Sequence, residues 1–170
     1  MKIKTAIYTA TICVAVTALS WLWLSSFSET KVPQIRVNTI KGQTLDFASL
    51  TGKPLLVTFW ATTCSICLKE LPHLISLYNE LNNDGFEIIG IAMYYDPPNR
   101  VVELSRQKDI PYTIALDIDG SAAKAFGNIE VTPSSFLVDQ NGTIIDQQIG
   151  KLNVDKLRIE IKQLIKNKVS

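Results

Sequence analysis

Two cysteines are separated by only two residues, in the segment Cys64-Ser65-Ile66-Cys67. An apolar run precedes them and a stretch with helical spacing comes after them, so Cys64 is expected at the first turn of a helix. The unpaired backbone N–H groups of a first turn favour the thiolate, which is the nucleophile in disulfide exchange. Cys67 lies one turn further on the same face, within reach of a disulfide to Cys64. The pair is therefore predicted to attack a disulfide, form a mixed disulfide and resolve it internally.

Two other roles for the cysteine pair are open. A structural disulfide across this spacing closes almost no loop, so it would add little stability. A metal site is the other role, because Cys64, Cys67 and His73 offer three ligands, but a closed zinc site takes four. Cys13 lies in a distant apolar stretch, and His73 is the single histidine of the sequence. We therefore predict no metal and no organic cofactor, and we interpret His73 as a neutral, partly exposed helix residue.

The surrounding elements indicate an α/β fold. Apolar runs rich in β formers predict buried strands over 54–61 and 86–93, and the helical spacing between them predicts a helix over 65–81 that Pro72 should kink. The other expected elements are a short strand before residue 41, strands at 44–47, 111–116, 134–139 and 143–149, and helices at 99–108, 121–126 and 153–167. This order predicts a mixed central sheet with helices on both faces.

The N-terminal stretch holds the apolar excess of a chain whose mean hydropathy is +0.15. Residues 5–27 contain no charged side chain and are long enough to cross a bilayer as a helix. Lys2 and Lys4 precede this stretch, which favours a cytoplasmic N-terminus and export of the remainder of the chain. We predict that residues 1–28 form a single-pass anchor in the inner membrane, and a cleaved signal peptide is the alternative.

The rest of the chain is expected to be a linker at 29–34 and one domain at 35–170, since 170 residues are about one domain's worth. Without Lys2 and Lys4, 15 of the 17 basic residues remain against 16 acidic ones, which gives a net charge of −1. This balance excludes the basic surplus of a nucleic-acid-binding protein.

Two blocks of the sequence resemble the TlpA/ResA-like branch of the thioredoxin superfamily. The first reads Phe59-Trp60-Ala61-Thr62-Thr63-Cys64-Ser65-Ile66-Cys67-Leu68-Lys69-Glu70-Leu71-Pro72, similar to the branch's Trp-Ala-x-x-Cys-x-x-Cys-x-x-Glu-x-Pro. The second begins at Asp117, contains Thr132-Pro133-Ser134-Ser135-Phe136 and ends at Gly142. The resemblance covers about residues 33–168. It implies a thioredoxin fold with an N-terminal β-hairpin extension, which faces the periplasm or its equivalent and is held there by the anchor.

The resemblance also implies roles for individual residues. A cis peptide bond is expected between Thr132 and Pro133, where the Thr132 backbone contacts the substrate chain and Pro133 shapes the groove. Glu70 is expected to move a proton for a buried thiol, and a solvated helix charge is its alternative. The remaining predicted substrate contacts are Trp60, Thr63, Ser65 and Ile66.

The sequence departs from the family pattern at three places near the cysteines. Thr63 stands where a second tryptophan is common, which should alter substrate docking. Thr58 stands where cytosolic thioredoxins have a buried aspartate, so that proton relay is absent. Ser65-Ile66 replaces the common Gly-Pro or Glu-Pro dipeptide, which tunes the reduction potential.

Together these features predict a membrane-anchored, extracytoplasmic thiol–disulfide oxidoreductase with Cys64 as nucleophile and Cys67 as resolving thiol. The family mostly reduces, often apocytochrome cysteines before haem attachment, so a disulfide-containing protein substrate and a membrane electron-donor protein are expected partners. A peroxiredoxin-like thiol peroxidase is one alternative, although the Pro-x-x-x-Thr-x-x-Cys of that group has no match before Cys64. A non-enzymatic binding module built on the same fold is the other.

Overall fold

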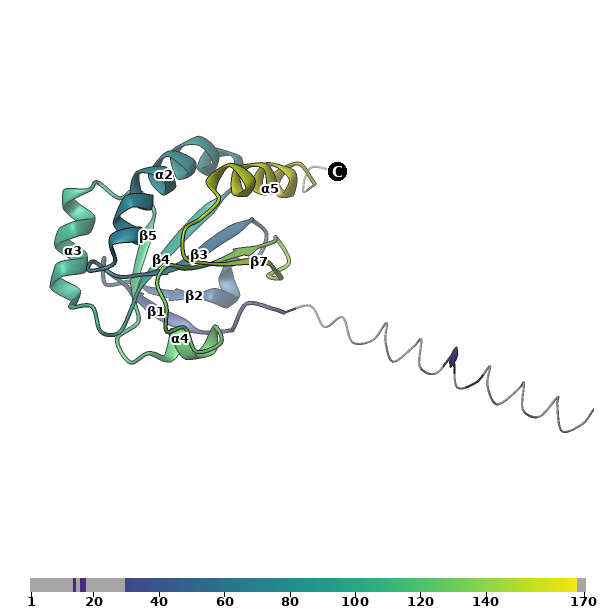
Figure 1. Ribbon diagram of the computed structural model, residues 1–170, viewed down its shortest axis with the longest axis horizontal. Coiled ribbons are helices and arrows are strands. Elements are labelled where there is room, and N and C mark those ends of the chain that lie inside the picture. Colours follow the sequence, from purple (N-terminus) through teal and green to yellow (C-terminus); the bar gives the residue numbers. More distant parts are fainter. Residues whose placement is uncertain (1–13, 15, 18–29, 168–170) are drawn as a thin grey trace, which may run out of the picture. The chain divides into compact units, whose positions relative to one another are not determined.

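The computed structural model describes residues 14, 16–17 and 30–167 (Figure 1). The anchor predicted at 1–28 therefore lies almost entirely outside the described residues. No helix in the part of the chain that is described is long and apolar enough to cross a membrane. The chain divides into Met1–Thr30 and Lys31–Ser170, and the fold is that of the second unit.

The described residues of the second unit form a seven-stranded mixed sheet in the order β2-β1-β5-β4-β3-β6-β7. In chain order, its strands are β1 (Arg36–Thr39), β2 (Thr44–Asp46), β3 (Leu55–Trp60), β4 (Glu87–Ala92), β5 (Thr113–Leu116), β6 (Ser134–Val138) and β7 (Ile144–Ile149). Strands β3, β4 and β5 are parallel, β6 is antiparallel to β3, and the β1–β2 hairpin pairs antiparallel with β5. This arrangement confirms the predicted mixed sheet and its N-terminal hairpin extension.

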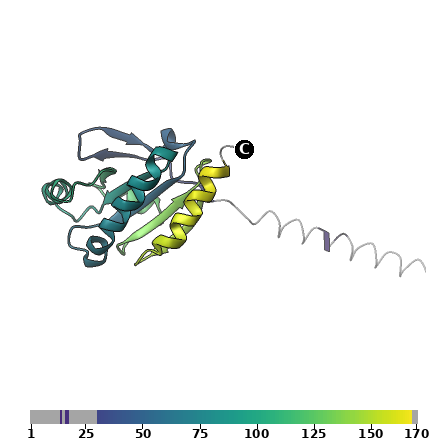
Figure 2. The same ribbon diagram turned by 90° about the horizontal axis from the view of Figure 1, so that it is seen from above.

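Helices cover both faces of this sheet, as Figures 1 and 2 show. The α-helices are α2 (Ser65–Leu81), α3 (Pro98–Gln107), α4 (Ser121–Ala125) and α5 (Val154–Asn167), and the 3-10 helices are η1 (Phe47–Leu50) and η2 (Asn82–Asp84). One apolar cluster joins Leu56 of β3 to Leu77 of α2, Val101 of α3 and Ile161 of α5. Helices α2, α3 and α5 therefore share one face, while α4 and η1 pack on the other.

The second apolar cluster is centred on Phe59, which is 0% exposed. Its ring makes edge-to-face contacts with Phe126 and Phe136 at centroid distances of 5.2 and 6.2 Å. Side chains alternate along a strand, so Phe59 faces this cluster while Leu56 faces the other. Because both faces are covered, all six residues of β3 are buried, as expected for its continuous apolar run.

The predicted bounds of the second strand and of the helix after the cysteines can be compared with the structure. The strand predicted at 44–47 ends at Asp46, because the Asp46 carboxylate accepts the backbone N–H of Ala48 at 2.9 Å and starts η1. Phe47 is consequently a buried residue of η1 and not a strand residue. Helix α2 has the predicted bounds and continues through Pro72 to Leu81.

We expect Phe59→Ala to lower the free energy of unfolding by about 3–5 kcal/mol, because it removes a fully buried ring and leaves a cavity. Urea denaturation of the oxidised protein measures this value. The control is Ile159→Ala on α5, whose side chain is 59% exposed and which should change stability by less than about 0.5 kcal/mol. Equal losses for the two variants would contradict the assignment of Phe59 to the core.

Candidate active site

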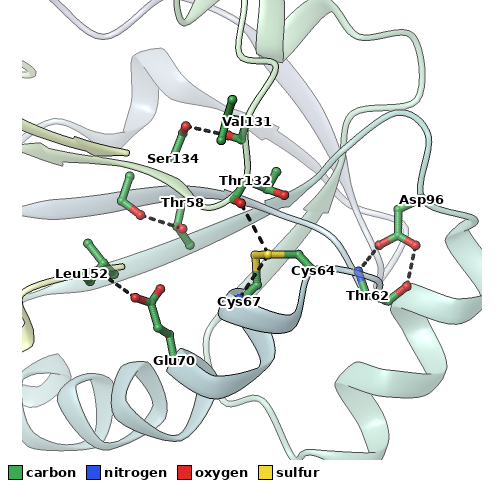
Figure 3. The surroundings of a disulfide bond; sticks show 11 residues. Thr58, Thr62, Cys64, Cys67, Glu70, Asp96, Val131, Thr132, Ser134 and Leu152 are labelled. Carbon is green, nitrogen blue, oxygen red and sulfur yellow. Dashed lines mark hydrogen bonds between the residues drawn. A yellow bond between two sulfur atoms is a disulfide. The ribbon is translucent and has the colours of Figure 1, made fainter. Parts of the chain in front are cut away.

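The cysteine pair lies where β3 gives way to α2 (Figure 3). Cys64 is the N-cap residue of α2, and its Sγ accepts the backbone N–H of Cys67 at 3.1 Å. The two residues form a disulfide with a Cα–Cα distance of 5.3 Å. The predicted placement of the pair at the first turn of a helix is therefore confirmed.

The two sulfur-bearing residues differ in exposure. Cys64 is partly exposed, whereas Cys67 is 6% exposed and belongs to the apolar cluster under α2. In the reduced protein, the Cys67 N–H and the positive end of the helix dipole stabilise a negative charge on the Cys64 sulfur. Cys64 is thus the more accessible of the two sulfur-bearing residues, and Cys67 is the buried one.

A loop from the distant half of the chain completes the site. The Thr132–Pro133 peptide bond is cis, as the resemblance implied. The carbonyl oxygen of Thr132 lies 3.5 Å from Cys64 Sγ. Ser134 holds this loop, since its hydroxyl donates to the carbonyl of Val131 at 2.7 Å. The backbone of Thr132 therefore lies beside Cys64.

The other predicted contact residues fall into two groups. Thr63, Ser65 and Ile66 are exposed around the disulfide, and the Ile66 side chain is 42% exposed. Trp60 is 5% exposed and lies beneath the disulfide. The structure thus places three of these residues at the surface and Trp60 in the interior.

A small cavity lies under the disulfide. Its volume is about 10 Å³, which is close to the room that one water molecule needs. Its lining includes the sulfur-bearing Cys67, the acid Glu70 and the hydroxyl residue Thr58. The rings of Trp60, Tyr112 and Pro133 also line it. Thr58 shares a buried hydrogen bond of 2.8 Å with Ser135, so its hydroxyl is already partnered. Among the residues lining the cavity, Glu70 is the one carboxylic acid.

Glu70 is 4% exposed, so its interpretation as a solvated helix charge is wrong. Its carboxylate accepts the backbone N–H of Leu152 (Figure 3). Burial raises the pKa of Glu70, and the Leu152 N–H and the positive charge of Lys151 oppose this effect only in part. Burial likewise raises the pKa of Tyr112, which keeps its phenol protonated. Glu70 is therefore a buried acid that holds its proton more strongly than an ordinary glutamate.

Asp96 was not among the predicted site residues, yet it is 4% exposed in the loop after β4. Its carboxylate accepts the backbone N–H of Thr62 at 2.5 Å and the Thr62 hydroxyl at 2.6 Å (Figure 3). These bonds fix the segment that leads into Cys64. The sequence contained a signal that Asp96 belongs to the site. Asp96 follows a buried strand that is parallel to β3 and precedes Pro97, so it lies at the same sheet edge as the cysteines.

The described residues contain no group of three or more His, Cys, Asp or Glu side chains placed to hold a metal ion. The reactive groups that the site brings together are its two sulfur atoms, one buried acid and the cis-proline loop. These groups can carry out thiol–disulfide exchange with proton transfer.

Comparison with known proteins identifies the family. The Redoxin family model matches residues 27–163. The chain belongs to the Redoxin family. This Redoxin protein is 30% identical to the thiol-disulfide oxidoreductase ResA of Bacillus thuringiensis over 135 residues, which cover 79% of this chain and 76% of the relative. The predicted TlpA/ResA-like character is thereby confirmed.

Solved structures agree with this assignment. A thiol:disulfide interchange protein of the thioredoxin family from Chlorobium tepidum superposes with a TM-score of 0.74 at 25% identity, over 81% of this chain and 97% of that one. A Neisseria meningitidis protein classed provisionally as a thioredoxin gives a TM-score of 0.75 at 29% identity, over 82% and 93% of the two chains. The Redoxin chain therefore has the thioredoxin fold.

The raised pKa of Glu70 predicts a pH dependence of stability. Between the ordinary glutamate pKa and the raised one, the folded protein binds a proton at Glu70 that the unfolded chain has released. The free energy of unfolding should therefore fall as pH rises through this interval, with a slope of up to about 1.4 kcal/mol per pH unit.

Urea denaturation of the oxidised protein at a series of pH values measures this slope. Glu70→Gln keeps an oxygen that can accept the Leu152 N–H but cannot titrate, so the slope should disappear. The matched control is Glu103→Gln, an exposed glutamate on α3, which should retain it. An unchanged slope in Glu70→Gln would contradict the raised pKa.

Proposed function

We propose that this protein is a membrane-anchored, extracytoplasmic thiol–disulfide oxidoreductase that reduces disulfides in protein substrates. The observation that carries the proposal is the position of Cys64 Sγ, which is partly exposed at the start of α2 and bonded to the buried Cys67. The name of the ResA relative supports the same reaction class. Residues Cys64, Cys67 and Glu70 form the catalytic group of the proposal.

The proposed reaction begins with the reduced protein. The Cys64 thiolate attacks one sulfur of the substrate disulfide, so a mixed disulfide forms and the first substrate thiolate leaves. The Cys67 thiol then passes its proton to the Glu70 carboxylate, and its thiolate attacks Cys64 Sγ. The second substrate thiolate leaves, both substrate thiolates take up protons, and the protein retains the Cys64–Cys67 disulfide. Two electrons have moved from the protein to the substrate.

Substrate binding in this proposal uses the surface around Cys64. The Thr132 carbonyl, 3.5 Å from Cys64 Sγ, is placed to accept a backbone N–H of the substrate chain. The buried Pro133 supports that backbone, and Thr63, Ser65 and Ile66 line the rim. Trp60 does not reach the surface in this proposal and contributes by lining the cavity beside Cys67.

The proposed direction is reduction, because an oxidising compartment already contains oxidants. The resemblance to the TlpA/ResA-like branch supports apocytochrome disulfides as substrates and hence a role in cytochrome c maturation. A reductase outside the cytoplasm needs electrons, so a dithiol electron-donor protein in the membrane would reduce the Cys64–Cys67 disulfide after each turnover.

The exchange mechanism predicts a trapped intermediate. Cys67→Ser lacks the resolving thiol, so mixed disulfides through Cys64 should accumulate in cells. Non-reducing gels and mass spectrometry would detect and identify the captured proteins. Cys64→Ser is the matched control and should capture none through Cys67, which is only 6% exposed. Absence of captured species from Cys67→Ser in both reducing and oxidising growth conditions would contradict thiol exchange.

Peroxide and cellular assays separate the alternatives. Rapid Cys64-dependent consumption of hydrogen peroxide by the purified protein would favour a thiol peroxidase instead. Intact function in cells carrying Cys64→Ser would favour a binding module that uses the fold without its thiols.

The proposed anchor predicts membrane association. The full chain should sediment with membranes and remain there after an alkaline carbonate wash, because residues 5–27 bury an uncharged stretch in the bilayer. A chain that begins at residue 29 should stay in the supernatant. Recovery of a mature protein whose N-terminus lies near residue 29 would instead establish a cleaved signal peptide.

A further inference from the structure

Exposed apolar side chains gather at the edge of the sheet where β4 and β5 end. Tyr94 and Tyr95 follow β4 and are 59% and 48% exposed, and Ile118 follows β5 and is 59% exposed. Because β3, β4 and β5 are parallel neighbours, their carboxyl ends meet at one edge of the sheet. Cys64 follows β3 at the same edge. Tyr94, Tyr95 and Ile118 thus form an apolar platform on the edge that carries the disulfide.

The rings of the apolar platform are held in place by several contacts. The two tyrosine rings meet edge to face, with their centroids 5.4 Å apart. The Tyr94 ring lies over Gly120 in the loop after β5, where a Cβ atom would be 3.5 Å from the ring. The loop that carries both rings is bonded to the active site, because the Asp96 carboxylate accepts the N–H and the hydroxyl of Thr62 at 2.5 and 2.6 Å. The apolar platform is therefore tied to the segment that leads into Cys64.

The carboxylates of the loop after β5 are bonded within that loop and to α4. The buried Asp117 carboxylate accepts the backbone N–H groups of Ala122 and Ala123, both at 2.9 Å. The exposed Asp119 accepts the N–H and the hydroxyl of Ser121 at 3.1 and 2.6 Å. Residues 93–97 and 117–120 contain no lysine or arginine. The apolar platform itself therefore presents rings and an aliphatic side chain, which suit an apolar partner.

The occupant of the apolar platform follows from the proposed reaction, in which the substrate chain becomes bonded to Cys64 through its own cysteine. Neighbouring strands lie about 4.8 Å apart, so β4 and β5 are about 5 and 10 Å from β3 along the edge. An extended chain advances about 3.3 Å per residue. Substrate residues about one to three positions from the bonded cysteine therefore reach the apolar platform when the chain runs across the strand ends toward β5.

We propose that the apolar platform is a specificity site, and that its tyrosines bind an apolar side chain close to the substrate cysteine. On the segment of Cys64 itself, the exposed residues Thr63, Ser65 and Ile66 carry no aromatic ring. The two tyrosines supply the large apolar contact area that this segment lacks. Substrates with charged side chains at the same positions are disfavoured, because a charge loses water there without gaining a partner. This inference rests on the proposed function, since it needs a substrate chain bonded to Cys64.

The test uses the reduced full chain in detergent micelles and three short peptides. Each peptide contains one cysteine, joined to thionitrobenzoate as a mixed disulfide, and the residues on both sides of the cysteine are leucine and phenylalanine, glutamate, or lysine. Attack of the Cys64 thiolate on the peptide sulfur bonds the peptide to Cys64 and releases thionitrobenzoate, whose absorbance reports the rate. The second-order rate constant of the apolar peptide should exceed those of the charged peptides by about tenfold or more.

Variants then locate the preference on the apolar platform. Tyr94→Ala and Tyr95→Ala should each lower the rate constant of the apolar peptide by about three- to tenfold and reduce its advantage over the charged peptides. Tyr95→Phe keeps the ring and should keep the preference. The matched control is Ile159→Ala on α5, which removes an apolar side chain that is also 59% exposed but lies outside the platform. This control should leave all three rate constants unchanged.

The outcomes separate this inference from the function on which it rests. Equal rate constants for the three peptides in the wild-type protein, a preference for the lysine peptide, or unchanged selectivity in both alanine variants would overturn the specificity site. Absence of Cys64-dependent release of thionitrobenzoate from every peptide would instead overturn the proposed function, so the two failures are distinguishable.

Discussion

The site depends on one short contact, in which the backbone N–H of Cys67 points at the sulfur of Cys64 at 3.1 Å. This contact exists because β3 ends at Trp60 and α2 begins at Ser65, which leaves Cys64 as the N-cap. At that point the sulfur lies at the positive end of the helix dipole, and its residue is also partly exposed at the edge of the sheet. If α2 began one turn earlier, Cys64 would be an ordinary helix residue and would lose both properties.

The second constraint is the burial of a carboxylic acid one turn beyond Cys67. Burying Glu70 is costly, and the backbone N–H of Leu152, 82 residues away, offsets part of that cost. The same contact joins the β7–α5 connection to α2.

Sequence patterns predicted the parts of this arrangement that are local. The apolar run of β3, the spacing of α2 and the position of Cys64 are set by neighbouring residues, and the structure matches them. The cis bond before Pro133 came from family resemblance, because cis is a minority state for an isolated X-Pro bond. The pairing of Asp96 with Thr62 and of Glu70 with Leu152 was not predicted. Both join side chains to backbone groups on loops that only the tertiary fold brings together.

The disulfide closes a very small loop, so opening or closing it should have little effect on the stability of the fold. A bridge between residues three apart in sequence contributes little stability, so the two apolar clusters hold the fold whether the bridge is closed or open. Cys67 is buried in the oxidised protein, and an apolar, buried environment disfavours a thiolate. An acid with an ordinary pKa would be a poor acceptor for that thiol proton. Because burial also raises the pKa of Glu70, the two groups become better matched, and the proton transfer that closes the disulfide becomes less unfavourable.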